Sequence, residues 1–310
     1  MKREHSRNDT NNYEEVIERL DFLRRMQIWP VKNFLNYKGW LDNFSEQEEK
    51  EIASRIIDFF LFFPKQMIIQ MLKTVVGYCG EYLKIQFQNW QHDDFLKKCI
   101  FSYIPGETLS STDSGYIFLR YLRDELHIPE KNLLDYNKLL SLVNNSTDSI
   151  PIIFIDDFIG SGAQCDKAWN ENKIDSGKTL NEIASNSKHI FIYASLIANY
   201  IGYNRIKKNC IGLKLYTCHL LNNEYNLFDP NCLCWKKNNE LYLKGTELII
   251  SKSKKLNIPF SGGASVNDVK GFNEQGLALS FEHGTPDAIP SFFYWCDDNW
   301  TPLLRKEYKR

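Results

Sequence analysis

The chain has 310 residues, of which 43% are hydrophobic, and its 38 Lys and Arg residues balance 39 Asp and Glu residues. This length allows one large domain or about two ordinary ones, and the near-zero net charge argues against a dedicated nucleic-acid coat protein. Eight cysteines without a framework spacing, and a polar N-terminus without an apolar signal-peptide stretch, predict a reduced, cytoplasmic protein. No apolar run reaches membrane-spanning length, so we expect no membrane partner.

The N-terminal part of the chain shows helical patterns. Apolar residues recur at helical spacing between residues 12 and 27. Ser45 and Glu48 have the spacing of a capping box, which predicts the start of a second helix. Pro64 suits the first turn of a third helix. We therefore predict an N-terminal helical region over residues 1–97.

A strand, a small-residue loop and a helix follow this region. Residues 99–104 have the composition of a strand, and residues 105–115 are rich in Gly, Ser and Thr. Asp113 is a suitable N-cap for the helix after the loop. The residues alone indicate a capped loop and do not show whether it binds a ligand.

The most informative stretch is IPIIFIDDFIGSGAQCDKA, residues 150–168. Ile152 to Ile155 predict a buried strand of a parallel sheet, and a helix is expected from Ala163. Between them lie two adjacent Asp residues and a Gly-Ser-Gly turn. Glycines allow the backbone to approach a ligand closely, and the N–H groups of the turn and the helix start favour a phosphate. Two ionised carboxylates accept hydrogen bonds from the adjacent hydroxyls of a ribose.

This order of strand, acid pair, glycine turn and helix is typical of a phosphate site in an open α/β sheet. The alternative is an ordinary strand end with an Asp/Gly turn. Strands are also predicted at residues 190–197 and 211–218, with a helix at 203–208 between them, whereas residues 136–149 indicate a polar connection. The alternation predicts a mostly parallel sheet with right-handed crossovers over residues 98–220.

The last ninety residues have a different pattern. Residues 222–239 indicate a loop, residues 245–257 a helix, and residues 277–281 an apolar strand. His283 follows this strand and is a candidate general acid or base, because the ordinary pKa of histidine lies near neutral pH. A hydrogen-bonding loop histidine is the alternative. We predict a C-terminal α/β segment, residues 221–310, that covers the site.

Two further motifs would indicate a nucleoside triphosphate site and a zinc site, but each departs from the usual pattern. Residues 176–179 have the tail of a Walker A motif, but Asn172 occupies its first glycine position and no strong strand precedes it. Four potential zinc ligands are Cys218, His219, Cys232 and Cys234. Their Cys-x-Cys spacing is tighter than that of common structural zinc sites, so we predict no metal site made by the protein alone.

The central stretch resembles the ribose 5-phosphate loop of type I phosphoribosyltransferases. In that family the acid pair holds the ribose hydroxyls, which implies this role for Asp156 and Asp157. The turn of that family holds the 5-phosphate, which implies a binding role for Gly160, Ser161, Gly162, Ala163 and Gln164. The sequence departs from the family where two Thr hydroxyls are replaced by Gly160 and Gln164. The first loop of the family holds pyrophosphate, which implies that role for Ser114 and Gly115.

A wider set of motifs resembles the phosphoribosyltransferase-like family of bacterial conflict systems, found as effectors beside retron reverse transcriptases. These motifs are WLDNF at residues 40–44, SG at 114–115, FIDDFIGSG, FEHGTP at 281–286, and the late Trp300 with Arg305. The resemblance implies a phosphoribosyltransferase-like sheet core with an N-terminal helical region and a C-terminal α/β segment.

The function implied by this resemblance is that of a phosphoribosyl- or nucleotide-acting enzyme, serving as a toxic effector in antiphage defence. Its ligand would be 5-phosphoribosyl-1-pyrophosphate or a nucleotide, with Mg²⁺ bound mainly through the substrate pyrophosphate. His283, together with the acid pair, is the candidate catalytic residue. The alternative is a catalytically inactive nucleotide-sensing or scaffold protein that binds a reverse transcriptase with its noncoding RNA or DNA product. An oligomer is compatible with both functions.

Overall fold

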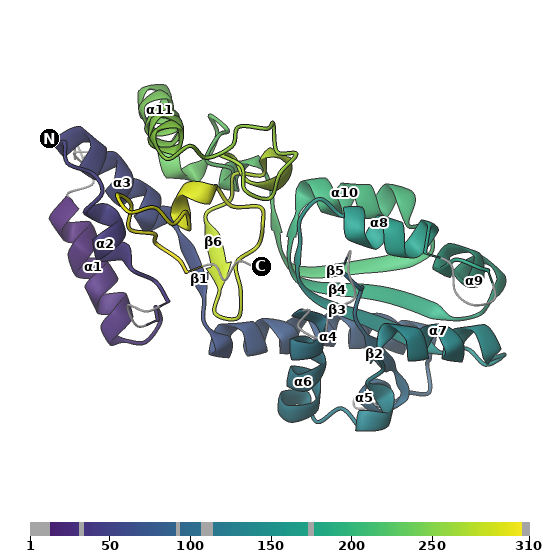
Figure 1. Ribbon diagram of the computed structural model, residues 1–310. Helices are drawn as coiled ribbons and strands as arrows, with labels where there is room; N and C mark the ends of the chain where they lie inside the picture. Colours follow the sequence, from purple (N-terminus) through teal and green to yellow (C-terminus); the bar gives the residue numbers. More distant parts are fainter. Residues whose placement is uncertain (1–12, 31–33, 91–93, 107–113, 173–176, 306–310) are drawn as a thin grey trace, which may run out of the picture. The chain divides into compact units, whose positions relative to one another are not determined.

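The computed structural model describes residues 13–30, 34–90, 94–106, 114–172 and 177–305. The chain divides into two compact units. The sheet unit comprises residues 66–222, and the terminal unit joins residues 1–65 to residues 223–310. Both are drawn in Figure 1.

Four parallel strands form the main sheet, in the order β2-β3-β4-β5 (Figure 1). Their bounds are β2 Ile100–Ser102, β3 Pro151–Ile159, β4 Ile190–Asn199 and β5 Leu213–Leu221. The inner strands β3 and β4 are buried along most of their length, because helices on both faces of a parallel sheet shield its inner strands from water. The α/β fold with a parallel sheet that the sequence predicts is confirmed.

Helices cover both faces of this sheet, with α8 and α10 on one face and α4 on the other (Figure 1). On the first face Trp169 of α8 packs edge-on against Phe191, with ring centroids 5.3 Å apart. On the second face the Cys218 thiol donates to the backbone oxygen of Met71 at 3.1 Å. The helices are α4 Lys65–Gln86, α5 Asp94–Lys98, α6 Ser114–Leu126, α7 Tyr136–Asn145, α8 Ala163–Asn170, α9 Leu180–Asn186 and α10 Tyr200–Asn209. The first residue of α4, Lys65, belongs to the terminal unit.

The register between β3 and β4 sets the positions of the site residues. It aligns Phe154 with Tyr193 and Asp156 with Ser195. Since successive side chains of a strand point to opposite faces, Phe154 and Asp156 share one face. That face is covered by α8, because Phe154 belongs to the same buried cluster as Trp169.

The prediction of a polar connection at residues 136–149 is wrong, because most of it forms α7. Asp135 caps this helix by accepting a hydrogen bond from Lys138 N at 2.9 Å. Four residues at helical spacing are buried: Tyr136, Leu139, Leu140 and Val143. This spacing identifies an amphipathic helix. The composition of the segment does not reveal the helix, because polar residues lie between the four buried ones.

The terminal unit combines both ends of the chain around aromatic side chains. Trp40 packs against Phe44 at 5.0 Å between ring centroids and is stacked with Phe293 at 5.7 Å. Phe44 in turn contacts Trp300 at 5.6 Å. Two motifs distant in sequence therefore meet in one core. The elements of this unit are α1 Tyr13–Arg25, α2 Tyr37–Leu41, α3 Gln47–Phe59, β1 Leu61–Phe63, α11 Asn239–Lys255 and β6 Leu279–Phe281, with β1 and β6 paired in parallel.

Two sequence predictions in this unit are wrong in detail. The predicted capping box does not form, because Glu46 is the N-cap of α3 and makes no side-chain cap bond. Glu48 instead pairs with Lys244 Nζ at 2.7 Å. The helix predicted at residues 245–257 is α11. It begins at Asn239, because Asn238 accepts hydrogen bonds from the first N–H groups of the helix. Among the residues described, no helix is long and apolar enough to cross a membrane.

Candidate functional site

The acid pair lies within β3. The sequence predicts a strand that ends at Ile155, whereas β3 continues through Ile159. The strand continues because β4 provides pairing partners beyond the acids, including Ile197 for Phe158. Pairing with β4 therefore continues before and after the acid pair, near the carboxyl end of the sheet. This pairing fixes the backbone positions of Asp156 and Asp157.

Asp156 is bound by two donors from the protein. The Tyr193 hydroxyl donates to its Oδ2 at 2.5 Å, and the Asp157 N–H donates to its Oδ1 at 2.9 Å. Burial raises the pKa of Asp156 well above its ordinary value, and the charge of Asp157 and a hydrogen bond with its carboxyl raise this pKa further. The Tyr193 hydrogen bond acts in the opposite direction. A neighbouring cationic or hydrogen-donating ligand would stabilise the charged pair.

The turn after β3 leads directly into the start of α8. Gly162 is the N-cap of this helix, with a left-handed φ of 72° and no side-chain cap bond. The Ser161 hydroxyl accepts from Ala163 N at 3.3 Å. The first N–H groups of a helix have no partners inside the helix and attract anions. The start of α8 therefore has the polarity required for a phosphate site.

Gly202 of α10 lies directly against this turn. A Cβ atom at position 202 would lie 2.3 Å from the Gly160 carbonyl oxygen and 2.8 Å from Gly162 N. These are backbone atoms, so only glycine permits this approach. Sequence reasoning missed Gly202. The available signal was a glycine inside a helical pattern, which often marks a close backbone approach.

Gln164 connects the turn to the chain after β2. Its Nε2 atom donates to the carbonyl oxygens of Pro105 at 2.8 Å and Ile104 at 3.2 Å. The side-chain amide is therefore bonded to the protein, and the binding role predicted for Gln164 is left to its backbone. This side chain ties the start of α8 to the segment that leads into the predicted pyrophosphate loop.

Replacing Gln164 by Glu is expected to destabilise the sheet unit by about 1–3 kcal/mol, because a carboxylate cannot donate to two carbonyl oxygens. Urea denaturation followed by circular dichroism measures this loss. Both glutamines are exposed, so the control is Gln70→Glu, the same change within α4, where an effect within about 0.5 kcal/mol is expected. Equal stabilities of the two variants would show that the bonds of Gln164 do not matter.

The predicted pyrophosphate loop is described only at its ends. Residues 107–113, which include the predicted cap Asp113, lie outside the described residues. Helix α6 begins at Ser114. Gly115 packs on Tyr103, since a Cβ atom there would lie 2.4 Å from the ring carbon Cγ. Gly115 therefore has a packing role, and ligand binding by Ser114 and Gly115 stays a prediction.

The Walker-like motif has a structural role where it is described. Thr179 is the N-cap of α9 and forms a capping box with Glu182, whose carboxylate accepts from Thr179 N at 2.7 Å. The threonine therefore supports a helix start, which accounts for its type at this position.

The FEHGTP motif lies in the terminal unit. Glu282 accepts a hydrogen bond from Lys65 N at 2.7 Å and so caps the start of α4. Thr285 and Ser280 share a hydrogen bond of 2.8 Å between their hydroxyls. The half-buried His283 stacks on Phe281, with ring centroids 5.3 Å apart. The acid pair, the turn and Gln164 come together in the sheet unit, and His283 belongs to the other unit.

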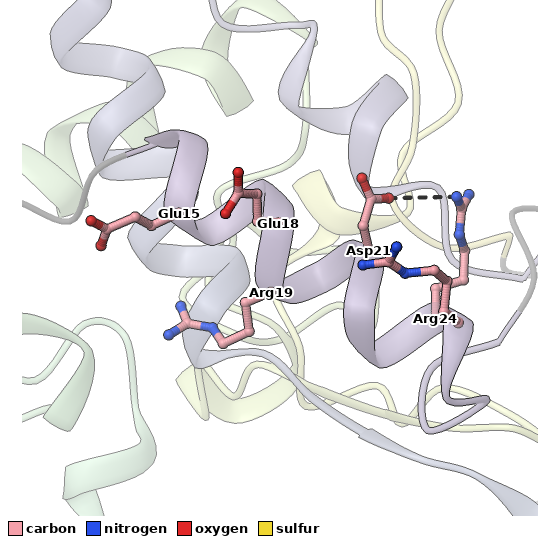
Figure 2. Close-up of a pocket in the computed structure, with 6 residues that line it drawn as sticks. Glu15, Glu18, Arg19, Asp21 and Arg24 are labelled. Carbon is pink, nitrogen blue, oxygen red and sulfur yellow. Dashed lines mark hydrogen bonds and ion pairs between the residues drawn. The ribbon is translucent and has the colours of Figure 1, made fainter.

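A separate surface hollow of about 710 Å³ lies beside α1 (Figure 2). Its lining is entirely charged: Glu15, Glu18, Arg19, Asp21, Arg24 and Arg25. Several of these charges are already paired, Arg24 with Asp21 at 3.4 Å and Arg19 with Asp58. The hollow contains none of the residues that the sequence identifies as a site.

Comparison with known proteins gives one family. A profile of the PRTase-CE family matches residues 37–306. No curated protein matches the chain. The matched range includes the acid pair, the glycine turn, Gly202 and the FEHGTP motif. The chain belongs to the PRTase-CE family and is a phosphoribosyltransferase-like protein.

Proposed function

We propose that the protein binds a ribose 5-phosphate compound, either 5-phosphoribosyl-1-pyrophosphate or a nucleotide, at the carboxyl end of β3. The observation that carries this proposal is the hydrogen-bonded acid pair placed next to the start of α8, whose N-cap Gly162 makes no side-chain cap bond. Asp156 and Asp157 would accept the ribose hydroxyls, and the backbone of Gly160 to Gln164 would bind the 5-phosphate. Ser114 and Gly115 would contact the pyrophosphate.

The proposed reaction is phosphoribosyl transfer or nucleotide glycoside cleavage. Both pass through a ribose that carries positive charge at its anomeric carbon, so catalysis would come from positioning and from electrostatic stabilisation. Mg²⁺, held mainly by pyrophosphate oxygens and water, would offset the charge of the leaving group. The acid pair would hold the ribose in place and place negative charge near it.

The proposed biological role is that of a toxic effector in an antiphage defence system, of the kind found beside retron reverse transcriptases. The order of the five motifs along the chain, which resembles that of the conflict-system family, supports this role. A cytoplasmic location and a reverse transcriptase complex as partner belong to the same proposal.

One observation favours a second function, that of a catalytically inactive nucleotide sensor or scaffold. The side-chain amide of Gln164 donates to Pro105 and Ile104, so among the side chains of Gly160 to Gln164 only the Ser161 hydroxyl keeps a donor for a phosphate, because it accepts from Ala163 N. The turn thus offers mainly backbone donors to a phosphate. Such a site is able to bind a nucleotide without turning it over.

Turnover assays separate the two functions. The purified full-length chain is incubated with Mg²⁺ and labelled 5-phosphoribosyl-1-pyrophosphate, NAD or nucleotides, alone and after co-expression with its genomic neighbours. Product formation, together with a changed cellular nucleotide pool, supports the enzyme. Binding without product supports the sensor. Absence of both binding and turnover for every compound contradicts the ribose 5-phosphate site itself.

His283→Ala is expected to lower turnover by about two orders of magnitude if the imidazole acts as a general acid or base. The melting temperature should change little, because a half-exposed loop side chain contributes little to stability. The control is His127→Ala, the same change at an exposed histidine, for which full activity is expected. Unchanged turnover of the His283 variant would remove the imidazole from the mechanism.

A further inference from the structure

Tyr193 is a buried tyrosine with a hydroxyl bonded to a carboxyl group of the candidate site. The side chain is 3% exposed and lies on β4 opposite Phe154. Its hydroxyl reaches diagonally across the ladder to Oδ2 of Asp156 at 2.5 Å. Diagonal neighbours on adjacent strands lie within reach of an aromatic side chain. This contact joins residues that are 37 positions apart in the sequence.

Several titratable groups of the described residues surround Asp156. The titratable groups facing it are Asp157 on its own strand, Tyr193 on β4, and the Cys165 thiol of α8, which lies beside Cys210. The Cys165 thiol stays protonated, because the neighbouring Cys210 and burial raise its pKa well above its ordinary value. Tyr193 also stays protonated, because burial raises the pKa of its hydroxyl. Tyr193 is therefore a permanent donor to Asp156, and Asp157 is a like charge.

We propose that Tyr193 is a positioning residue of the proposed ribose site. Its hydroxyl holds Oδ2 of Asp156, fixes the carboxyl in one orientation, and favours the charged form that accepts a ribose hydroxyl. This role rests on the proposed function. The role adds a specific cause for the ionisation of Asp156. A hydrogen bond to the charged carboxylate stabilises it, whereas burial and the charge of Asp157 favour the protonated form.

The test removes only this hydroxyl. In Tyr193→Phe the titration midpoint of the Asp156 carboxyl should move upward by about one to two pH units, because a hydrogen bond to the charged form is lost. The ¹³C signal of this carboxyl, assigned with Asp156→Asn, reports the midpoint in ligand-free protein. Affinity for Mg²⁺ and 5-phosphoribosyl-1-pyrophosphate, measured by calorimetry across pH, should show the same shift, with wild-type affinity recovered at high pH.

The matched control is Tyr136→Phe. Tyr136 is a buried tyrosine of the same unit, 4% exposed, and its hydroxyl donates to the Ala168 carbonyl at 3.3 Å rather than to an acid. This variant should leave both midpoints unchanged, even where it lowers the melting temperature. If the hydroxyls contributed only to packing, both variants would lose stability, and neither would shift the titration midpoint of the Asp156 carboxyl.

An unchanged Asp156 midpoint in Tyr193→Phe would overturn the inference. So would a loss of affinity that is equal at every pH, because this result indicates a packing defect. If wild-type protein binds no 5-phosphoribosyl-1-pyrophosphate at any pH, the proposed function fails instead. The carboxyl titration would then still decide whether Tyr193 controls the charge of Asp156.

Discussion

Replacing Asp156 and Asp157 together by Asn is expected to weaken the binding of Mg²⁺ and 5-phosphoribosyl-1-pyrophosphate by at least about a hundredfold and to abolish any turnover. Each carboxylate would contribute a charge-assisted hydrogen bond to a ribose hydroxyl, and losing two such bonds costs about 3 kcal/mol or more. Calorimetry gives the affinity, and toxicity in cells gives the functional result.

The fold of this double variant should persist. The folded pKa of Asp156 is raised above its unfolded value, so its contribution to stability is present at low pH and is lost as pH rises through the folded pKa. At neutral pH the Asn variant should therefore be as stable as the wild type or more stable. Asn also retains an acceptor for Asp157 N and a donor for the Tyr193 hydroxyl.

A second adjacent acid pair provides the control. Asp297 and Asp298 are exposed in the terminal unit, and the same two substitutions there should change neither affinity nor toxicity. A variant at Asp156 and Asp157 that keeps full affinity and toxicity would show that the ribose site is assigned to the wrong residues.

Gly202→Ala is expected to displace the glycine turn and to remove phosphate binding, with a loss of stability of about 1–3 kcal/mol. The added methyl group would lie 2.3 Å from the Gly160 carbonyl oxygen and 2.8 Å from Gly162 N. Backbone atoms cannot rotate away as a flexible side chain can, so α10 and the turn must separate. Urea denaturation measures the stability, and calorimetry with 5-phosphoribosyl-1-pyrophosphate measures the binding.

Gly77→Ala is the matched control for this substitution. Gly77 lies within α4, and a Cβ atom there would meet nothing within 4 Å. Alanine is the better helix former by up to about 1 kcal/mol, so this variant should be as stable as the wild type or more stable. If Gly202→Ala behaves like Gly77→Ala, the close approach of α10 to the turn is unimportant.

The sequence predicts those features of the site that are local in the chain. The apolar run before Asp156, the acid pair and the glycine turn lie within 20 residues, so their types and spacing alone indicate a strand, a turn and a helix. The exact end of the strand was not predictable, because β3 continues past the acids only where β4 pairs with it. Local composition does not carry this information.

Helix α7 was missed although its signal is local, whereas the contacts around the site that sequence reasoning missed join distant segments. Tyr193 reaches Asp156 from another strand, and Gln164 reaches a carbonyl 60 positions away. Gly202 is adjacent to the turn only once α10 is packed on the sheet. Glu282 caps α4 from a position 217 residues away in the sequence. Predicting these roles requires knowing which segments lie side by side in the fold, and the pattern of a single sequence does not show this.

The most direct test of the ribose 5-phosphate site is a crystal structure of the full chain with Mg²⁺ and 5-phosphoribosyl-1-pyrophosphate. The account predicts the 5-phosphate on the N–H groups between Gly160 and Gln164, with the ribose hydroxyls on Asp156 and Asp157. A ligand bound only elsewhere, with the N–H groups of this turn bonded within the protein, would contradict it.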